Sequence, residues 1–373
     1  PSVIATAGTV ASASSLGSYE TVFIDTLQAR TFQFFWETAH PRTGLAPDRW
    51  PTRSFASAAA TGFALTAYPI GAERGYVRRE AAARRALRTL RFLWTAPQGD
   101  APAGCTGTRG LFYHFLDPET GHRFERVELS TIDTALLLAG ALCCQSYFDR
   151  PTAAEDSIRA LADSLCARAD WRWASVRPPT IGHGWDPENG HLGYDWRGYN
   201  EALLLYVLAL GSPTHAVEPA AYEAWLAGYR WGEFHGQAHF GFAPLFGHQF
   251  SQAFIDFRGL GDRYMKEKKI DYFEHSRRAT YVQQKYAHDN PHGWVGYDSL
   301  CWGVTASDGP GEKYNFGDKK FLGYAGRGTS GPEYNYFDDG TIAPYGPLSS
   351  LPFAPAIVLP TIRNINAKYG KEL

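Results

Sequence analysis

The sequence predicts an all-α protein built as a single domain, with hairpins and long loops between its helices. Apolar residues recur at three- and four-residue steps over most of the chain, and no linker separates the helical segments. The chain shows no repeat of fixed period, which favours a closed ring of helix pairs, an α/α toroid, over an α-solenoid. We expect residues 18–373 to form the domain and residues 1–17 to form an N-terminal tail.

Ten helices are expected in this domain, and several carry clear end signals. Ser130 is a typical N-cap, and Gly211 followed by Pro213 is a typical helix end. Residues 290–346 show little periodicity and are expected to form long ordered loops. The expected helices cover residues 19–38, 55–71, 77–95, 130–149, 154–168, 200–211, 218–230, 247–266, 271–288 and 354–368.

Composition excludes several classes of protein. The net charge is −2 and basic residues are scattered, so neither nucleic acid nor a membrane surface is an expected partner. No run of about 18 apolar residues could span a membrane. The five cysteines form no zinc spacing, and a stable fold does not require disulfides here. The first twenty residues resemble the end left by removal of a signal peptide.

The stretch GWDPENGHLGYDWRGYNE, residues 184–201, concentrates acids and rings directly before an apolar helix. Asp186 and Glu188 fall in an Asp-Pro-Glu-Asn-Gly turn, which favours a structural role for both. Glu201 has two interpretations. In the first, it is an acid in the first turn of a helix capped by Asn200, where its negative charge interacts favourably with the helix dipole. In the second, it is a desolvated acid whose raised pKa lets it donate a proton near neutral pH. The expected substrate-binding side chains here are Trp185, Tyr194, Trp196, Arg197 and Tyr199.

Further acids lie in two other segments. Asp133 falls three residues after Ser130, which predicts either a capping-box-like pair or a catalytic carboxylate, with Glu128 as the alternative acid of this loop. His248, Gln252 and Asp256 are spaced four apart and would form a polar stripe on a helix. Such a stripe indicates either a buried network or the wall of a ligand site.

Three more residues complete the substrate-binding candidates. Arg258 is either a partner of Asp256 or a clamp on the substrate, and Trp302 and Asp308 lie in the late loops. His235 and His239 are four apart, but Gly236 weakens a helix there and no carboxylate is placed as a third ligand. We therefore expect neither a metal nor a cofactor.

Acids and exposed rings, without metal, phosphate or dinucleotide motifs, indicate carbohydrate chemistry. Sugar faces stack on aromatic rings, and cleavage of a glycosidic bond needs two carboxylates. The rings would hold the sugar, and the acid before the helix would act on it.

The motifs also carry a resemblance, which covers about residues 20–368. The chain resembles the bacterial glucoamylase-like glycoside hydrolases, a family that includes endo-β-1,2-glucanases. The residues that carry the resemblance are FYHFLDPETG, ELSTIDTALLLAGAL, GYDWRGYNEALLLYVLALGSPTH, FAPLFGHQFSQAFIDFRG, DYFEHSRRATYVQQ, WGVTASDGPG and FDDGTIAPYGPLSSLPFAPAIVLP.

This resemblance implies an (α/α)6 toroid and an anomer-inverting hydrolase of β-glucan, most simply β-1,2-glucan, acting in an endo or sophorose-releasing mode. Glu201 would be the general acid and Asp133 a candidate base. A separation of these two carboxyl groups well above about ten ångströms would instead shift the role of base to Asp256 or Asp308. An exported, periplasmic or secreted monomer with an oligo- or polysaccharide substrate is expected. Two alternatives remain: an α-glucan exo-hydrolase or transglycosylase on the same scaffold, and a catalytically silent carbohydrate-binding protein.

Overall fold

Helices dominate the computed structural model, which describes residues 18–331 and 336–371. The predicted tail, residues 1–17, lies outside the described residues. The α-helices are α1 Ser18–Thr38, α2 Ala58–Glu73, α3 Arg79–Thr95, α4 Thr131–Tyr147, α5 Ala153–Arg168, α6 Leu203–Leu210, α7 Ala220–Leu226, α8 Arg263–Lys268, α9 Tyr272–Asp289, α10 Tyr345–Ser349 and α11 Pro355–Tyr369.

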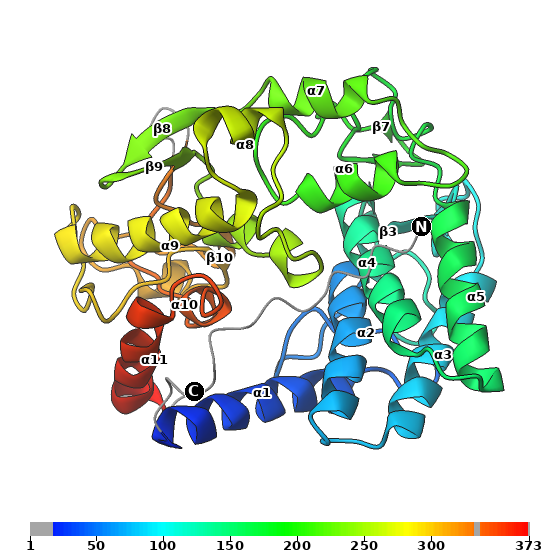
Figure 1. Ribbon diagram of the computed structural model, residues 1–373, viewed down its shortest axis with the longest axis horizontal. Helices are drawn as coiled ribbons and strands as arrows, with labels where there is room; N and C mark the ends of the chain where they lie inside the picture. The colour runs from blue at the N-terminus through cyan, green and yellow to red at the C-terminus, as the bar shows by residue number, and fades with distance from the viewer. Residues whose placement is uncertain (1–17, 332–335, 372–373) are drawn as a thin grey trace.

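The chain travels once around the molecule. In Figure 1 it passes from α1 at the bottom through α2–α5 on the right, then through α6 and α7 at the top. It continues through α8 and α9 to α11, which lies close to the start of α1 in this view. Residues distant in sequence can therefore face one another from opposite parts of this path.

Short strands occupy the connections between helices. They are β1 Ala56–Ser57, β2 Gly107–Thr108, β3 Leu111–Tyr113, β4 Phe115–Leu116, β5 Leu129–Ser130, β6 Gly184–Asp186, β7 Gly190–His191, β8 Trp231–Phe234, β9 Gln237–Phe240, β10 Ala306–Ser307 and β11 Ala325–Gly326. The largest sheet is antiparallel in the order β2-β3-β5-β6-β7. In its register Leu129 pairs with both Tyr113 and Trp185, so three distant segments meet where β5 enters α4.

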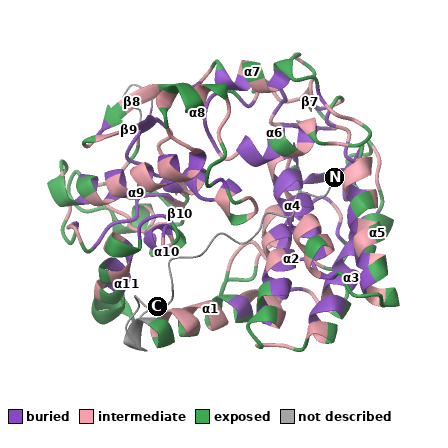
Figure 2. Cartoon of the chain, in the orientation of Figure 1, coloured by how far each residue is buried: buried purple, intermediate pink, exposed green. Residues whose placement is uncertain are grey.

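Helices α2 and α4 pack backbone against backbone. A Cβ atom added at Gly140 would lie 2.1 Å from the carbonyl oxygen of Gly62, and one added at Gly62 would lie 2.3 Å from that of Leu136. Only glycine permits so close an approach. Figure 2 shows buried residues along both helices, which form the centre of the larger core cluster.

Side chains fix where the helices begin. The hydroxyl of Ser57 accepts a hydrogen bond from the backbone of Ala60, and Thr152 and Asp271 cap α5 and α9 in the same way. The predicted cap at Ser130 and the predicted stop at Gly211 are both confirmed.

The predicted helix over 247–266 is wrong. Only two short 3-10 turns, Leu245–His248 and Ser251–Ala253, precede α8 there. Tertiary contacts keep this segment from forming a continuous helix. Gln249 donates hydrogen bonds to Gly346 and Ser350, and the His248 carbonyl accepts one from Ser276. Among the described residues, none of the helices has the length and apolar character needed to cross a membrane.

Candidate active site

Asp133 lies in the first turn of α4, and only 7% of its surface is exposed. The hydroxyl of Ser130 accepts a hydrogen bond from the Asp133 backbone at 3.2 Å and donates its own proton to the Asp133 carboxylate. The capping pair expected from the sequence is therefore present. Burial raises the pKa of Asp133, while the charge of His114 and the Ser130 hydrogen bond act in the opposite direction.

His114 bridges two carboxylates beside α4. Its Nδ1 lies 2.8 Å from Oε1 of Glu128, and its Nε2 lies 3.6 Å from Oδ1 of Asp133. Burial opposes a charge on this ring, but the two carboxylates outweigh it and raise the pKa of His114 to about 9. The imidazole therefore stays protonated at neutral pH and supplies a fixed positive charge next to Asp133.

Sequence reasoning did not single out His114. The signal lay in the alternating hairpin, because pairing of β3 with β5 brings the residue after Tyr113 beside the residue before Leu129. His114 and Glu128 could have been matched across the two strands from that register.

Glu201 lies in the turn just before α6, not in the predicted first turn of the helix. Asn200 accepts a hydrogen bond from the Ala202 backbone, and Ser251 donates to the Glu201 carbonyl at 3.1 Å. These contacts fix the backbone on both sides of the carboxyl group.

The Glu201 carboxyl group is incompletely hydrogen-bonded. Its Oε2 atom is buried and has no hydrogen-bond partner within the described parts of the chain. Burial, with a smaller contribution from the charge of Asp133, raises the pKa of Glu201 to about 7 against the opposing effect of its backbone hydrogen bond. The two carboxyl groups are thus within electrostatic reach of each other, and Glu201 is largely protonated below neutral pH.

Loops from both ends of the chain reach the same acids. The pKa of Tyr324 is raised first by burial and then by four carboxylates, those of Asp48, Glu201, Asp308 and Asp133. Arg49 joins two of these loops, because it pairs with Asp48 at 2.9 Å and with Asp308 at 3.2 Å. Asp308, a predicted binding residue, therefore lies near the acid pair, with 57% of its side chain exposed.

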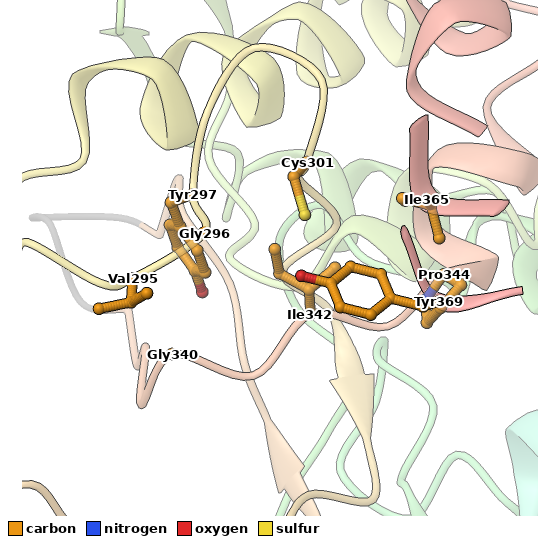
Figure 3. A pocket seen from close by; sticks show the side chains of 9 residues that line it. All are labelled: Val295, Gly296, Tyr297, Cys301, Gly340, Ile342, Pro344, Ile365 and Tyr369. Atoms are coloured by element: carbon orange, nitrogen blue, oxygen red, sulfur yellow. The ribbon is translucent and has the colours of Figure 1, made fainter. Parts of the chain in front are cut away.

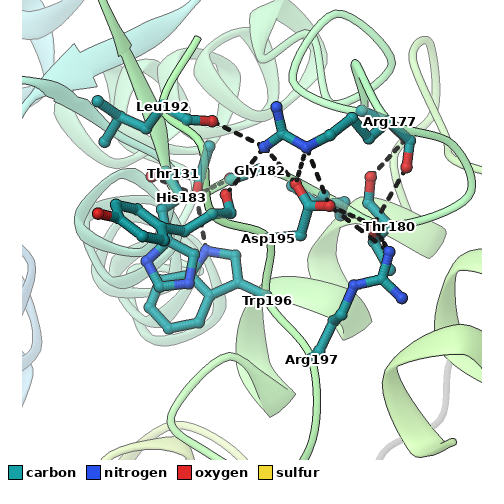
Figure 4. Close-up of polar contacts among 12 residues, drawn as sticks. Thr131, Arg177, Thr180, Gly182, His183, Leu192, Asp195, Trp196 and Arg197 are labelled. Atoms are coloured by element: carbon teal, nitrogen blue, oxygen red, sulfur yellow. Dashed lines mark hydrogen bonds and ion pairs between the residues drawn. The ribbon is translucent and has the colours of Figure 1, made fainter. Parts of the chain in front are cut away.

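Figure 4 shows how the stretch before Glu201 is built. Arg177 donates to both carboxylate oxygens of Asp195, and Thr180 donates to Asp195 as well. Trp196 stacks on His183 with ring centroids 3.7 Å apart, and its indole N–H donates to Thr131 in the first turn of α4. Trp196 thus ties the segment of Glu201 to the helix of Asp133.

The other predicted residues of this stretch have different surroundings. Tyr194 is exposed over 71% of its surface, and the Arg197 side chain over 56%. Trp185 packs edge-on against Trp173 and is partly buried. The turn role expected for Asp186 and Glu188 is confirmed, since Asp186 accepts from the Glu188 backbone.

Four predicted sugar contacts are corrected to core residues: Trp196, whose stacking on His183 is described above, Tyr199, His248 and Trp302. Tyr199 is 6% exposed and stacks on His248, whose Nε2 donates to the Phe242 carbonyl. Burial lowers the pKa of His248 to about 4, so it is a neutral packing residue. Trp302 has no exposed surface and donates to Thr361 at 2.7 Å. Buried rings of this kind cannot present a face to a sugar.

Asp256 and Arg258 pair with each other at the surface, with side chains 52% and 47% exposed. The polar stripe predicted for Asp256 does not form, because the segment is not a helix.

A pocket of about 360 Å³ lies beside α11. Figure 3 shows its walls, which come from the loop around Tyr297, the segment 340–344 and the last turns of α11. No predicted site residue lines it. In residues 18–331 and 336–371, no three His, Cys, Asp or Glu side chains are arranged to hold a metal ion.

Comparisons with known proteins identify relatives of this chain. Residues 193–373 match a family model described as "Glycoamylase: Putative glucoamylase". That span includes Glu201 but not Asp133. An exo β-1,2-glucooligosaccharide sophorohydrolase (non-reducing end) of Parabacteroides distasonis is 27% identical over 94% of this chain. The chain spans about half, 49%, of the length of that curated relative.

Two solved structures extend the comparison. A protein of Bacteroides fragilis described as a putative glucoamylase is 29% identical, with a TM-score of 0.81 over 96% of this chain and 84% of that one. An endo-β-1,2-glucanase of Chitinophaga pinensis, in complex with sophorotriose and glucose, is 26% identical, with a TM-score of 0.78 over 94% and 82%. The resemblance to the bacterial glucoamylase-like glycoside hydrolases, the family that includes the endo-β-1,2-glucanases, is thereby confirmed.

Proposed function

We propose that this chain is an anomer-inverting glycoside hydrolase that cleaves β-1,2-glucan, with Glu201 as the general acid and Asp133 as the general base. The observation that carries the proposal is the buried, unpartnered carboxyl oxygen of Glu201 within electrostatic reach of a second buried carboxylate. A general acid works best when its pKa lies near the working pH, and that of Glu201 is about 7.

The two acids would divide the reaction between them. Protonated Glu201 gives its proton to the glycosidic oxygen while the bond from that oxygen to the anomeric carbon breaks. A water molecule attacks the anomeric carbon from the opposite face, and its proton passes to Asp133. The configuration at the anomeric carbon is then inverted, and Asp133 releases its proton to solvent while Glu201 takes one up, which restores both groups.

His114 would be a positioning residue in this scheme. Its positive charge favours the ionised form of Asp133, against the burial that raises the Asp133 pKa. This charge therefore favours the form of Asp133 that a general base needs.

The substrate linkage is proposed from the relatives. The Parabacteroides and Chitinophaga proteins are named for action on β-1,2-linked glucose chains, and both match this chain over nearly its whole length. We also infer that the helices pair as an (α/α)6 toroid, supported by the single circuit that the chain makes in Figure 1. Export to the periplasm or the medium stays a prediction.

A panel of linked glucans tests the substrate. Reducing sugar should be released from β-1,2-glucan and not from α-1,4-, β-1,3- or β-1,4-glucans. Preferred release from an α-glucan would support the α-glucan exo-hydrolase alternative, and binding without release would support a carbohydrate-binding protein.

Proton NMR of the first product tests the mechanism. An inverting enzyme acting on a β-linked chain should release its new reducing end as the α-anomer before mutarotation. Initial release of the β-anomer would reject the inverting mechanism.

A further inference from the structure

A surface groove of about 830 Å³ lies between α1 and the loop of residues 47–54. Arg30, Gln33 and Glu37 of α1 line one side, and Trp50 and Arg53 of the loop line the other. None of these residues belongs to the acid pair, and the sequence analysis assigned none of them a role.

The lining has the chemistry of a sugar site. The Trp50 side chain is 65% exposed, although an indole ring of this size is normally buried. Arg49 and Arg53 flank it and carry planar donor groups. An open ring face suits the apolar C–H face of a pyranose, and guanidinium and amide groups beside it can hydrogen-bond the hydroxyls.

The loop that carries Trp50 is anchored rather than loose. The Asp48 backbone donates to the Phe55 carbonyl at 3.0 Å, and the Arg49 backbone donates to the Ser54 hydroxyl at 3.2 Å. Phe55 in turn packs on Phe115, with ring centroids 4.1 Å apart. The exposed ring is thus held at the tip of a closed loop, which reduces the entropy lost when a ligand stacks on it.

The same loop leads directly to the acids. Arg49 lines the groove and pairs with both Asp48 and Asp308. The carboxylate of Asp48 also contributes to the raised pKa of His114, which contacts Asp133. A chain that leaves the acid pair along this edge would pass Arg49 and reach Trp50.

We propose that this groove is a distal subsite that binds a β-linked glucan chain several glucose units away from the bond that is cleaved. The inference rests on the proposed function for the place of cleavage, and on the groove itself for the place of binding. It gives the enzyme a preference for long chains, because only these can reach both places at once.

Chain-length dependence tests the inference. The ratio of kcat/KM on long β-1,2-glucan to kcat/KM on the shortest cleaved oligosaccharide should fall about tenfold in Trp50→Ala, as expected for loss of one exposed aromatic contact. Trp50→Phe should restore part of the ratio. Trp94→Ala is the matched control, because Trp94 is 40% exposed and covered by Arg168 instead of lining the groove. An unchanged ratio in Trp50→Ala would overturn the inference.

A binding measurement separates this inference from the proposed function. In affinity gel electrophoresis, retardation of the protein by β-1,2-glucan should weaken in Trp50→Ala and persist in Trp94→Ala, whether or not the glucan is cleaved. Equal retardation of the two variants would reject the subsite. Failure of the wild-type enzyme to cleave any β-glucan would reject the proposed function alone.

Discussion

Asp133 and Glu201 are both buried carboxyl groups with raised pKa values, yet their surroundings differ. Asp133 is held by the Ser130 hydroxyl and faces a protonated His114, so its negative charge is compensated. Glu201 has a buried oxygen with no hydrogen-bond partner in the described structure, and no nearby cation lowers its pKa. The Ser130 and His114 contacts of Asp133 favour its ionised form, which a general base needs, and the burial of Glu201 favours its protonated form, which a general acid needs.

The largest effect is expected from removing the proton of Glu201. Glu201→Gln keeps the volume but cannot donate to a leaving group, so turnover should fall about 10²–10⁴-fold. Initial rates on β-1,2-glucan measure this. Glu223→Gln, at an exposed ion pair with Arg263, is the control and should keep wild-type rates. More than a tenth of wild-type turnover in Glu201→Gln would show that another group is the acid.

Asp133→Asn should lower turnover to a similar or slightly smaller extent, because the amide cannot accept the proton of the attacking water. The loss must be separated from damage to the helix start. Ser130→Ala removes the cap, costs about 1 kcal/mol of stability and leaves the carboxylate in place. Ser130→Ala should therefore unfold at the lower temperature and keep the higher turnover, and Asp133→Asn should show the reverse. Near wild-type turnover in Asp133→Asn would transfer the role of base to Asp308.

His114→Gln should change the pH dependence. In the wild type, kcat/KM should fall above about pH 7 as Glu201 ionises, and fall on the acid side as Asp133 is protonated. Without the His114 cation, the pKa of Asp133 rises, and the acid limb should move to higher pH. The alkaline limb should stay in place. His122→Gln, in the turn of the same hairpin, is the control. A uniform loss without a shift would indicate a purely structural role.

A further effect concerns stability. The pKa of Glu201 is raised from 4.5 in the unfolded chain to about 7 in the fold, so the unfolded chain loses its proton first as pH rises. Folding should therefore lose roughly 3 kcal/mol between those pH values, and Glu201→Gln should abolish that loss.

The His114 pairing gives a second window for the same measurement. Its stabilising effect is fully present below pH 6.5 and is lost as pH rises through about 9. This second loss should remain in Glu201→Gln. Denaturant unfolding at pH 5, 7 and 9 measures both windows, and identical pH curves for the two proteins would refute the desolvation of Glu201.

The sequence predicted most long helices because their signals are local. Periodicity and the Ser130 cap placed α4 to within a few residues. The same reasoning failed over 247–266, where contacts of Gln249 with Gly346 and Ser350 override a helical pattern. Such contacts span about a hundred residues of chain and leave no local trace.

The candidate site divides in the same way. Glu201 and Asp133 were selected from single motifs, and their catalytic roles stay predictions. His114 was missed because its partnership with Glu128 depends on strand register. The proximity of Asp48, Asp308 and Tyr324 to the acid pair was not predictable. It depends on how loops distant in the sequence pack against one another.

The contact between Gly62 and Gly140 has a consequence for how such an enzyme can diversify. Any side chain at either position would collide with the backbone of the opposite helix, so the platform under Asp133 tolerates no adjustment there. Residues 49–53 beside the α1 groove include no glycine in such a contact, whereas a Cβ atom added at Gly309 would lie 2.6 Å from the Leu322 carbonyl oxygen. Libraries aimed at new linkages or chain lengths should therefore vary residues 49–53 and leave Gly309 and the helix pair untouched.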